Sequence, residues 1–187
     1  PLSFSGRVKE ELSYQTGVAM HCRIAEIAAI LSLCGKVNID ENGKVSVKIH
    51  TENLAVSRKY FTLVKKTYNI DCDIAMRSHI HTGKSRSYIL DVKDDYAARK
   101  ILSSVKFMNG DGNFERDYTQ VDSLILRKAC CKRAFLRGAF LCAGSISEPE
   151  KTYHFEIVCT TPERAWQICD MMKTFDIEGK YITRKKY

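Results

Sequence analysis

Two pairs of residues that can bind soft metal ions, His21–Cys22 and Cys130–Cys131, stand at equivalent points of two similar stretches of the 187-residue chain. Imidazole nitrogen and thiolate sulfur are the ligands that zinc prefers, so four of them could in principle form one site. Neighbouring residues on a helix project about 100° apart, however, and each pair cannot easily offer both side chains to one ion. We therefore interpret the four as small packing residues and predict no bound metal and no other cofactor.

Each pair opens a helical stretch, and the two stretches align at an offset of 109 residues, with Cys22 on Cys131, Ala25 on Ala134, Ala29 on Gly138 and Gly35 on Gly144. In the second, Ala134, Gly138 and Cys142 recur at every fourth position, which places them on one helical face and lets another backbone approach closely. Both stretches end at a glycine, which we expect to adopt the left-handed conformation common after helices. The sequence thus predicts two helices packed along one seam, formed by Ala25, Ala29, Gly35, Ala134, Gly138 and Gly144.

The segments that follow the two helices also repeat. Val45, Val47 and Ile49 alternate with polar residues in the first copy, and 153–159 alternate similarly in the second, so each copy predicts a hairpin with one buried face. A helix and a further strand follow each hairpin. We predict an α+β fold of two pseudo-twofold αββαββα repeats with antiparallel sheets, the second repeat being incomplete.

This order, with the paired helices and the Gly138–Gly144 spacing, resembles the LAGLIDADG homing-endonuclease fold. More specifically, the chain resembles the WhiA family of bacterial regulators in its segments 3–12, 51–53, 130–141 and 144–159. The resemblance implies an N-terminal helical segment (1–19), a first repeat (20–106), a linker (107–127) and a truncated second repeat (128–187). It also implies that the family's C-terminal helix-turn-helix domain is absent from this chain, which we expect to be a fragment.

The resemblance also locates the residues that a nuclease would need. In LAGLIDADG nucleases an acid just before the closing glycine of each motif helix binds the catalytic metal ions. The matching positions here are Cys34 and Ala143, and the other acid of the motif corresponds to Ser32 and Leu141. None of these side chains offers the hard carboxylate oxygen that Mg²⁺ requires. We therefore predict a protein that is not an enzyme.

The net charge of +8 and the sequence pI near 9.1 favour a polyanionic partner. If the apolar strand positions pack on the helices, the intervening basic residues point to the opposite face of the sheets, and Arg77 and Arg184 occupy matching third strands. Lys84 and Arg86 are expected at a hairpin tip of this basic face. The predicted DNA-binding residues are Lys44, Lys48, Arg77, Lys84, Arg86, His154, Arg184 and Lys186.

Two functions remain open. The first is a non-catalytic domain that binds double-stranded DNA in a WhiA-like transcription factor for sporulation, cell division and chromosome segregation. The second is a protein-interaction scaffold, with regulatory or sigma-type proteins as partners, in which a helix-turn-helix binds the DNA. No segment is apolar enough to predict a membrane span, and the cysteines lack the spacing of a disulfide framework, so we expect a cytoplasmic, nucleoid-associated protein.

Overall fold

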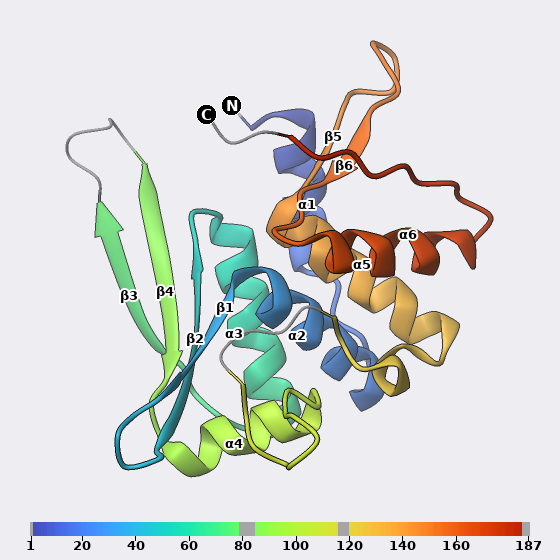
Figure 1. The fold of residues 1–187 in the computed structure, drawn as a ribbon. Coiled ribbons are helices and arrows are strands. Elements are labelled where there is room, and N and C mark those ends of the chain that lie inside the picture. The colour runs from blue at the N-terminus through green and yellow to red at the C-terminus, as the bar shows by residue number, and fades with distance from the viewer. Residues whose placement is uncertain (1, 79–84, 116–119, 185–187) are drawn as a thin grey trace.

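A computed structural model describes residues 2–78, 85–115 and 120–184 and shows two unequal repeats that meet along a pair of helices (Figure 1). Helix α1 (Phe4–Ser13) precedes the first repeat, and Ser3 caps it by accepting a hydrogen bond from the backbone N–H of Gly6. The first repeat contains, in order, α2 (Met20–Cys34), β1 (Gly35–Ile39), β2 (Val45–Thr51), α3 (Leu54–Tyr68), β3 (Asp73–Ser78), β4 (Arg86–Val92) and α4 (Asp95–Ser104).

The second repeat follows a short 3-10 helix, η2 (Ser123–Leu126). It contains α5 (Ala129–Ala143), β5 (Gly144–Ile146), β6 (Phe155–Ile157) and α6 (Pro162–Lys173). Within 174–184 the chain forms no strand, so the expected third strand around Arg184 is not formed. The predicted α+β class with antiparallel sheets is confirmed, and the first repeat shows the complete αββαββα order.

The four-stranded sheet has the order β1-β2-β4-β3, and every neighbouring pair is antiparallel. Side chains of a strand alternate between its two faces. Val45, Val47 and Ile49 of β2 are buried, as are Leu90 and Val92 of β4, because these positions face the helices. The inner face of the sheet therefore forms the core, and the alternate positions form an outer face that the helices leave uncovered.

Helices α2 and α5 run side by side in the same direction, and their contact is close because Gly138 has no side chain. A Cβ atom at this position would lie 2.9 Å from the backbone oxygen of Glu26 and 3.0 Å from the Cβ of Ala29. Ala25 and Ala134 are also buried in this contact. Four of the six residues predicted to form the seam, Ala25, Ala29, Ala134 and Gly138, therefore lie in this contact.

The backbone conformation of the two glycines that close α2 and α5 differs from the prediction. Gly35 and Gly144 are both extended, with φ near −90°, rather than left-handed. A Cβ at Gly35 would lie 2.4 Å from the backbone oxygen of Leu31, so glycine is required because each strand turns back directly against the last helical turn. The left-handed residues other than glycine are instead Asn69, Lys106 and Asp176, which follow α3, α4 and α6.

A buried carboxylate connects four helices beside this seam. Glu26 of α2 is fully buried and lies 3.1 Å from Nζ of Lys59 in α3 and 2.9 Å from Nη2 of Arg137 in α5. Lys59 also donates to the carbonyls of Leu12 and Gln15 at the end of α1. Burial lowers the pKa of Lys59, while the Glu26 carboxylate acts in the opposite direction. Each charge in this cluster is thus compensated by a partner from another helix.

We expect Gly138→Leu to destabilise the protein by roughly 3 kcal/mol or more, because the added side chain would have to displace the α2 backbone. Urea unfolding followed by circular dichroism measures the change, with Lys100→Leu on the exposed surface of α4 as the control. If the two variants unfolded at the same midpoint as the parent chain, the helices would not be in close contact at Gly138.

We expect Glu26→Gln to cost about 3–5 kcal/mol in unfolding free energy, because it leaves Lys59 buried without a compensating charge. The same substitution at exposed Glu11 should have little effect, and both can be compared by thermal and urea unfolding. A double substitution, Glu26→Leu with Lys59→Met, should recover part of the loss since it removes both buried charges. A Glu26→Gln chain as stable as the Glu11→Gln chain would contradict this role for the carboxylate.

Candidate nucleic-acid interface

The C-terminal ends of α2 and α5 lie together, where a LAGLIDADG nuclease would bind its metal ions. Cys34 accepts a hydrogen bond from Cys142, which lowers the pKa of the Cys34 thiol. Lys9 of α1 interacts electrostatically with both thiols, and burial lowers the pKa of its ammonium group. Thiols, Ala143 and an amine offer no hard oxygen ligand, and a charged Lys9 repels a divalent cation. The residues at this point therefore do not fit a catalytic magnesium ion.

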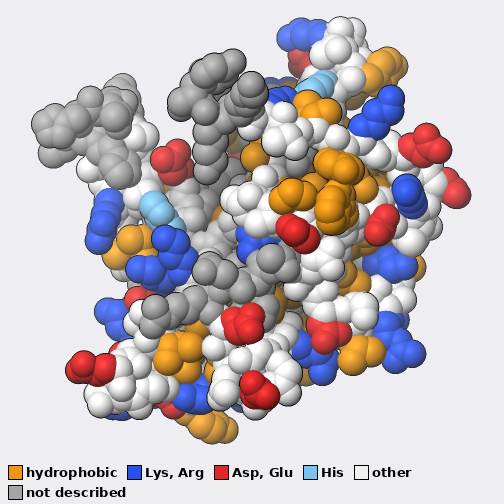
Figure 2. Space-filling view, in the orientation of Figure 1, with side chains coloured by type: hydrophobic (Ala, Val, Ile, Leu, Met, Phe, Trp, Pro, Cys, Tyr) orange, Lys and Arg blue, Asp and Glu red, His pale blue; other side chains and the backbone are white. Residues whose placement is uncertain are grey.

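A group of basic side chains occupies the outer face of the four-stranded sheet. Lys36 of β1 and Lys48 of β2 are exposed and directly opposite each other in the register, and His50 follows two residues along β2. Arg77 of β3 shares this face, since it alternates with the inward positions of its strand. We call Lys36, Lys48, His50 and Arg77 the basic face. Figure 2 shows Lys and Arg side chains around a histidine over the strands at the left.

Lys36 was missed in the sequence analysis, although its alternation with buried Val37 was a usable signal. The basic face also includes acidic neighbours that the sequence analysis did not anticipate. Asp91 is opposite Lys48 on one side and opposite Asp73 on the other. The positive charge is therefore concentrated toward β1 and β2 and toward Arg77.

The other described residues of the first repeat that were predicted to bind DNA do not lie on the basic face. Lys44 is exposed but lies in the β1–β2 loop, just before the first residue of β2. Arg86 alternates with Ser87 and shares its side of β4 with Tyr88, Leu90 and Val92, so the expectation that it lies on the outer face is wrong. It is exposed because that end of the strand extends beyond the core. Lys84 and, at the other end of the chain, Lys186 lie outside the described residues.

In the second repeat the two predicted basic residues that the structure describes, His154 and Arg184, are paired with an acid. Nη2 of Arg184 lies 3.0 Å from the Glu156 carboxylate, and Nε2 of His154 lies 3.3 Å from the same group. Ser145 is opposite Glu156 in the two-stranded sheet, where each strand has only three residues. The predicted symmetrical basic surface is thus built mainly by the first repeat.

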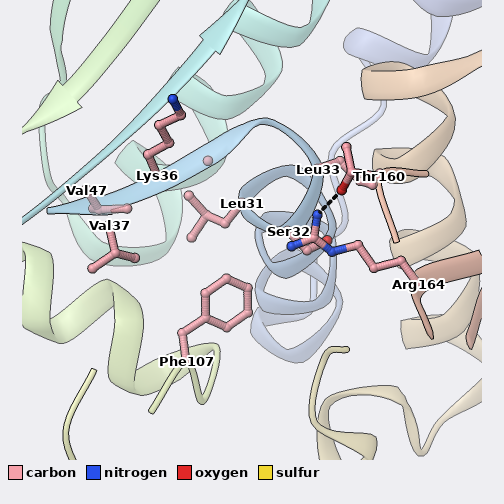
Figure 3. Close-up of a pocket in the computed structure, with 10 residues that line it drawn as sticks. Leu31, Ser32, Leu33, Lys36, Val37, Val47, Phe107, Thr160 and Arg164 are labelled. Carbon is pink, nitrogen blue, oxygen red and sulfur yellow. Dashed lines mark hydrogen bonds between the residues drawn. The ribbon is translucent and has the colours of Figure 1, made fainter. Parts of the chain in front are cut away.

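A pocket of about 270 Å³ lies where the two repeats meet. The last turn of α2, the start of β1 and Phe107 line it from the first repeat, and Thr160 and Arg164 line it from the second. Arg164 donates a hydrogen bond of 2.6 Å to Thr160, and Figure 3 shows its side chain extending toward Ser32. Lys36 lines the pocket and also belongs to the basic face. Lys36 and Arg164 therefore both line this pocket, which lies between the basic face and the second repeat.

The four soft ligands at the opposite ends of α2 and α5 do come together. Their ligand atoms, in His21, Cys22, Cys130 and Cys131, all lie within 4.8 Å of one another. The objection that adjacent helical residues diverge too far is therefore wrong for this geometry. All eight cysteines are free thiols, as the sequence analysis expected.

The paired parallel helices, the strands that start at their closing glycines and the antiparallel sheet define a LAGLIDADG-like domain. Two family models match the chain: "WhiA N-terminal LAGLIDADG-like domain" over residues 20–108 and "WhiA LAGLIDADG-like domain" over residues 132–187. The chain belongs to the WhiA family.

Relatives and solved structures agree with this assignment. The chain is 44% identical over its whole length to a "Probable cell division protein WhiA" of Lachnoclostridium phytofermentans and 38% identical over 98% of its length to that of Lachnospira eligens. It spans 59% and 57% of these two proteins. The crystal structure of full-length DUF199/WhiA from Thermatoga maritima has a TM-score of 0.65 at 18% identity, covering 95% of this chain and 52% of that one. This last likeness shows the fold alone.

No helix among the described residues is long and apolar enough to cross a membrane.

We expect no metal-dependent nuclease activity, and we expect that Cys34→Asp with Ala143→Asp will not create one, because Lys9 and the neighbouring thiols would still surround the introduced acids. Nicking of supercoiled plasmid in Mg²⁺ or Mn²⁺, followed on agarose gels, tests both chains. Nicking by the parent chain that a substitution next to Gly35 or Gly144 abolishes would contradict the prediction.

Proposed function

We propose that this chain is a non-catalytic DNA-binding domain of a WhiA-like transcription factor that acts in cell division, sporulation and chromosome segregation. The relatives are named as probable cell division proteins, and the family assignment supports that part of the role. In the cell the domain would act in the cytoplasm, associated with the nucleoid. Its partner is double-stranded DNA.

The basic face is the observation that carries this proposal. Adjacent strands are about 4.8 Å apart, so Lys36 and Lys48 present two ammonium groups side by side, and Arg77 adds a third cation across the sheet. The strands fix the spacing of the backbone positions that carry these side chains, whereas lysines in separate loops have no such fixed spacing. A fixed array of cations on an extended surface suits the regularly spaced phosphates of a duplex, which position a protein without specifying sequence.

The junction pocket extends the same surface toward the second repeat. Lys36 lines both, and Arg164 brings another guanidinium to the far side of the pocket. A duplex lying across the first repeat's sheet would therefore meet positive charge again at the repeat boundary. The overall net charge of +8 adds long-range attraction to this arrangement.

A second candidate function is an interaction scaffold for regulatory or sigma-type proteins, with DNA bound by a helix-turn-helix elsewhere. Asp73 and Asp91 on the outer face, and the Arg184–Glu156 ion pair, favour it because they oppose phosphate binding. Under this alternative the basic residues would contribute little to any affinity for DNA.

We expect Lys36→Ala with Lys48→Ala to weaken binding to duplex DNA and to reduce the slope of log K against log salt by about two, since each phosphate contact contributes about 0.9 to the slope. Fluorescence anisotropy over a salt series measures both quantities. All sequences should be affected alike because phosphate contacts carry little sequence information. The matched control is Lys66→Ala with Lys100→Ala, which removes the same charge from exposed positions of α3 and α4.

Substitutions of Arg77 and Arg184 should have different effects in the same assay. Arg77→Ala should reduce the slope by about one, whereas Arg184→Ala should change it less because Glu156 already compensates that guanidinium. If the basic-face and control variants lost the same affinity and slope while folded, the basic face would not be the DNA contact. The scaffold function would then be preferred.

A further inference from the structure

We propose that His21, Cys22, Cys130 and Cys131 bind one structural zinc ion that joins the N-terminal ends of α2 and α5. The four residues supply one imidazole nitrogen and three thiol sulfurs, which is a complete donor set for tetrahedral zinc. No position is left open for a water or a substrate, so the role is structural rather than catalytic. The inference does not depend on DNA binding.

The separations between the donor atoms support a tetrahedral site. Nδ1 of His21 lies 3.1 Å from Sγ of Cys131, 3.4 Å from Sγ of Cys22 and 3.9 Å from Sγ of Cys130. Zinc bonds of about 2.0–2.3 Å at tetrahedral angles place donor atoms about 3.6–3.8 Å apart. These three distances bracket this range, and none of the separations within the group exceeds 4.8 Å. Small side-chain rotations therefore suffice to enclose an ion.

The position of the residues on their helices explains how adjacent side chains converge. Both pairs lie in a first turn, since α2 begins at Met20 and α5 begins at Ala129. Helical Cβ atoms tilt toward the N-terminus, so side chains of the first turn lean beyond the end of the helix. Two neighbours can then flank one point in front of the helix, although they would diverge around its middle. The parallel packing of α2 and α5 brings both such points together.

The local charges also favour a bound ion with thiolate ligands. Three thiols that bind as thiolates release three protons to solvent, and with Zn²⁺ and a neutral imidazole the site carries a net charge of −1. Two helix N-termini point at it, each with a partial positive charge of about one half. Neither N-terminus has a side-chain cap, because Ala19 and Lys128 make no capping hydrogen bond. The thiolates would thus accept hydrogen bonds from the free backbone N–H groups of the two helix starts, which no capping side chain occupies.

The zinc site would join the two repeats at the N-terminal ends of α2 and α5. The candidate nucleic-acid interface begins at the opposite ends of these helices. Cys34 and Cys142 each follow a ligand of their own helix by twelve residues, so they lie about 18 Å from the zinc site at a rise of 1.5 Å per residue. Cys131 is buried, whereas His21 is exposed and leaves the ion a path from solvent. Zinc would therefore fix the relative position of the repeats without contacting bound DNA.

The direct test is metal content in the untagged 187-residue chain, reduced and incubated with zinc before gel filtration. We expect about one zinc ion per chain by elemental analysis. Replacement by Co²⁺ should give the intense visible bands of tetrahedral cobalt together with thiolate-to-cobalt charge-transfer bands in the near ultraviolet. A chelator that removes the ion should lower the melting temperature, because binding to the folded state alone stabilises it.

Cys22→Ser and His21→Asn alter half-exposed and exposed positions, and each should weaken zinc retention while the chain stays folded by circular dichroism. Cys130→Ser with Cys131→Ser should abolish both retention and the charge-transfer bands. The matched control is Cys34→Ala with Cys142→Ala, which removes one cysteine from the other end of each helix and should keep the ion. Substoichiometric zinc in the parent chain, or equal zinc in all these variants, would overturn the proposal.

Discussion

At Gly138 the backbone of α5 lies against the carbonyl of Glu26 in α2, because no side chain stands between them. This approach brings Arg137 to the Glu26 carboxylate, which in turn holds Lys59 of α3. Lys59 binds the end of α1, so the same contact positions the helix that carries Lys9. The interior is therefore organised around one buried acid whose cations come from both repeats.

Much of this arrangement was accessible from the sequence because it is periodic. Small residues at every fourth position predicted the seam, and alternating residues such as Val45 and Val47 predicted which face of the sheet is buried. These patterns depend on local geometry, which a sequence expresses directly. The same logic indicated which positions near Gly35 and Gly144 lack the acids of a nuclease.

The remaining features depend on side chains that meet from distant parts of the chain. Glu26, Lys59 and Arg137 stand on three different helices, and no spacing in the sequence relates them. Arg184 was expected to be available for phosphate, but its neutralisation by Glu156 is set by the path of the chain after α6. The convergence of His21 with the cysteines was missed for a similar reason, since the rule for helix interiors does not hold in a first turn.

The two helices of the seam are far apart along the chain, and this affects how the protein folds during its synthesis. Glu26 and Arg137 are 111 residues apart, so α2 leaves the ribosome several seconds before α5 at about 5–20 residues per second. During that interval the first repeat can form from its local contacts, with Glu26 already paired to Lys59, but the side of α2 around Ala25 and Ala29 stays uncovered. The nascent first repeat must therefore remain soluble with an open hydrophobic strip. The late arrival of α5 makes this strip the point at which chaperones or misassembly would compete with folding.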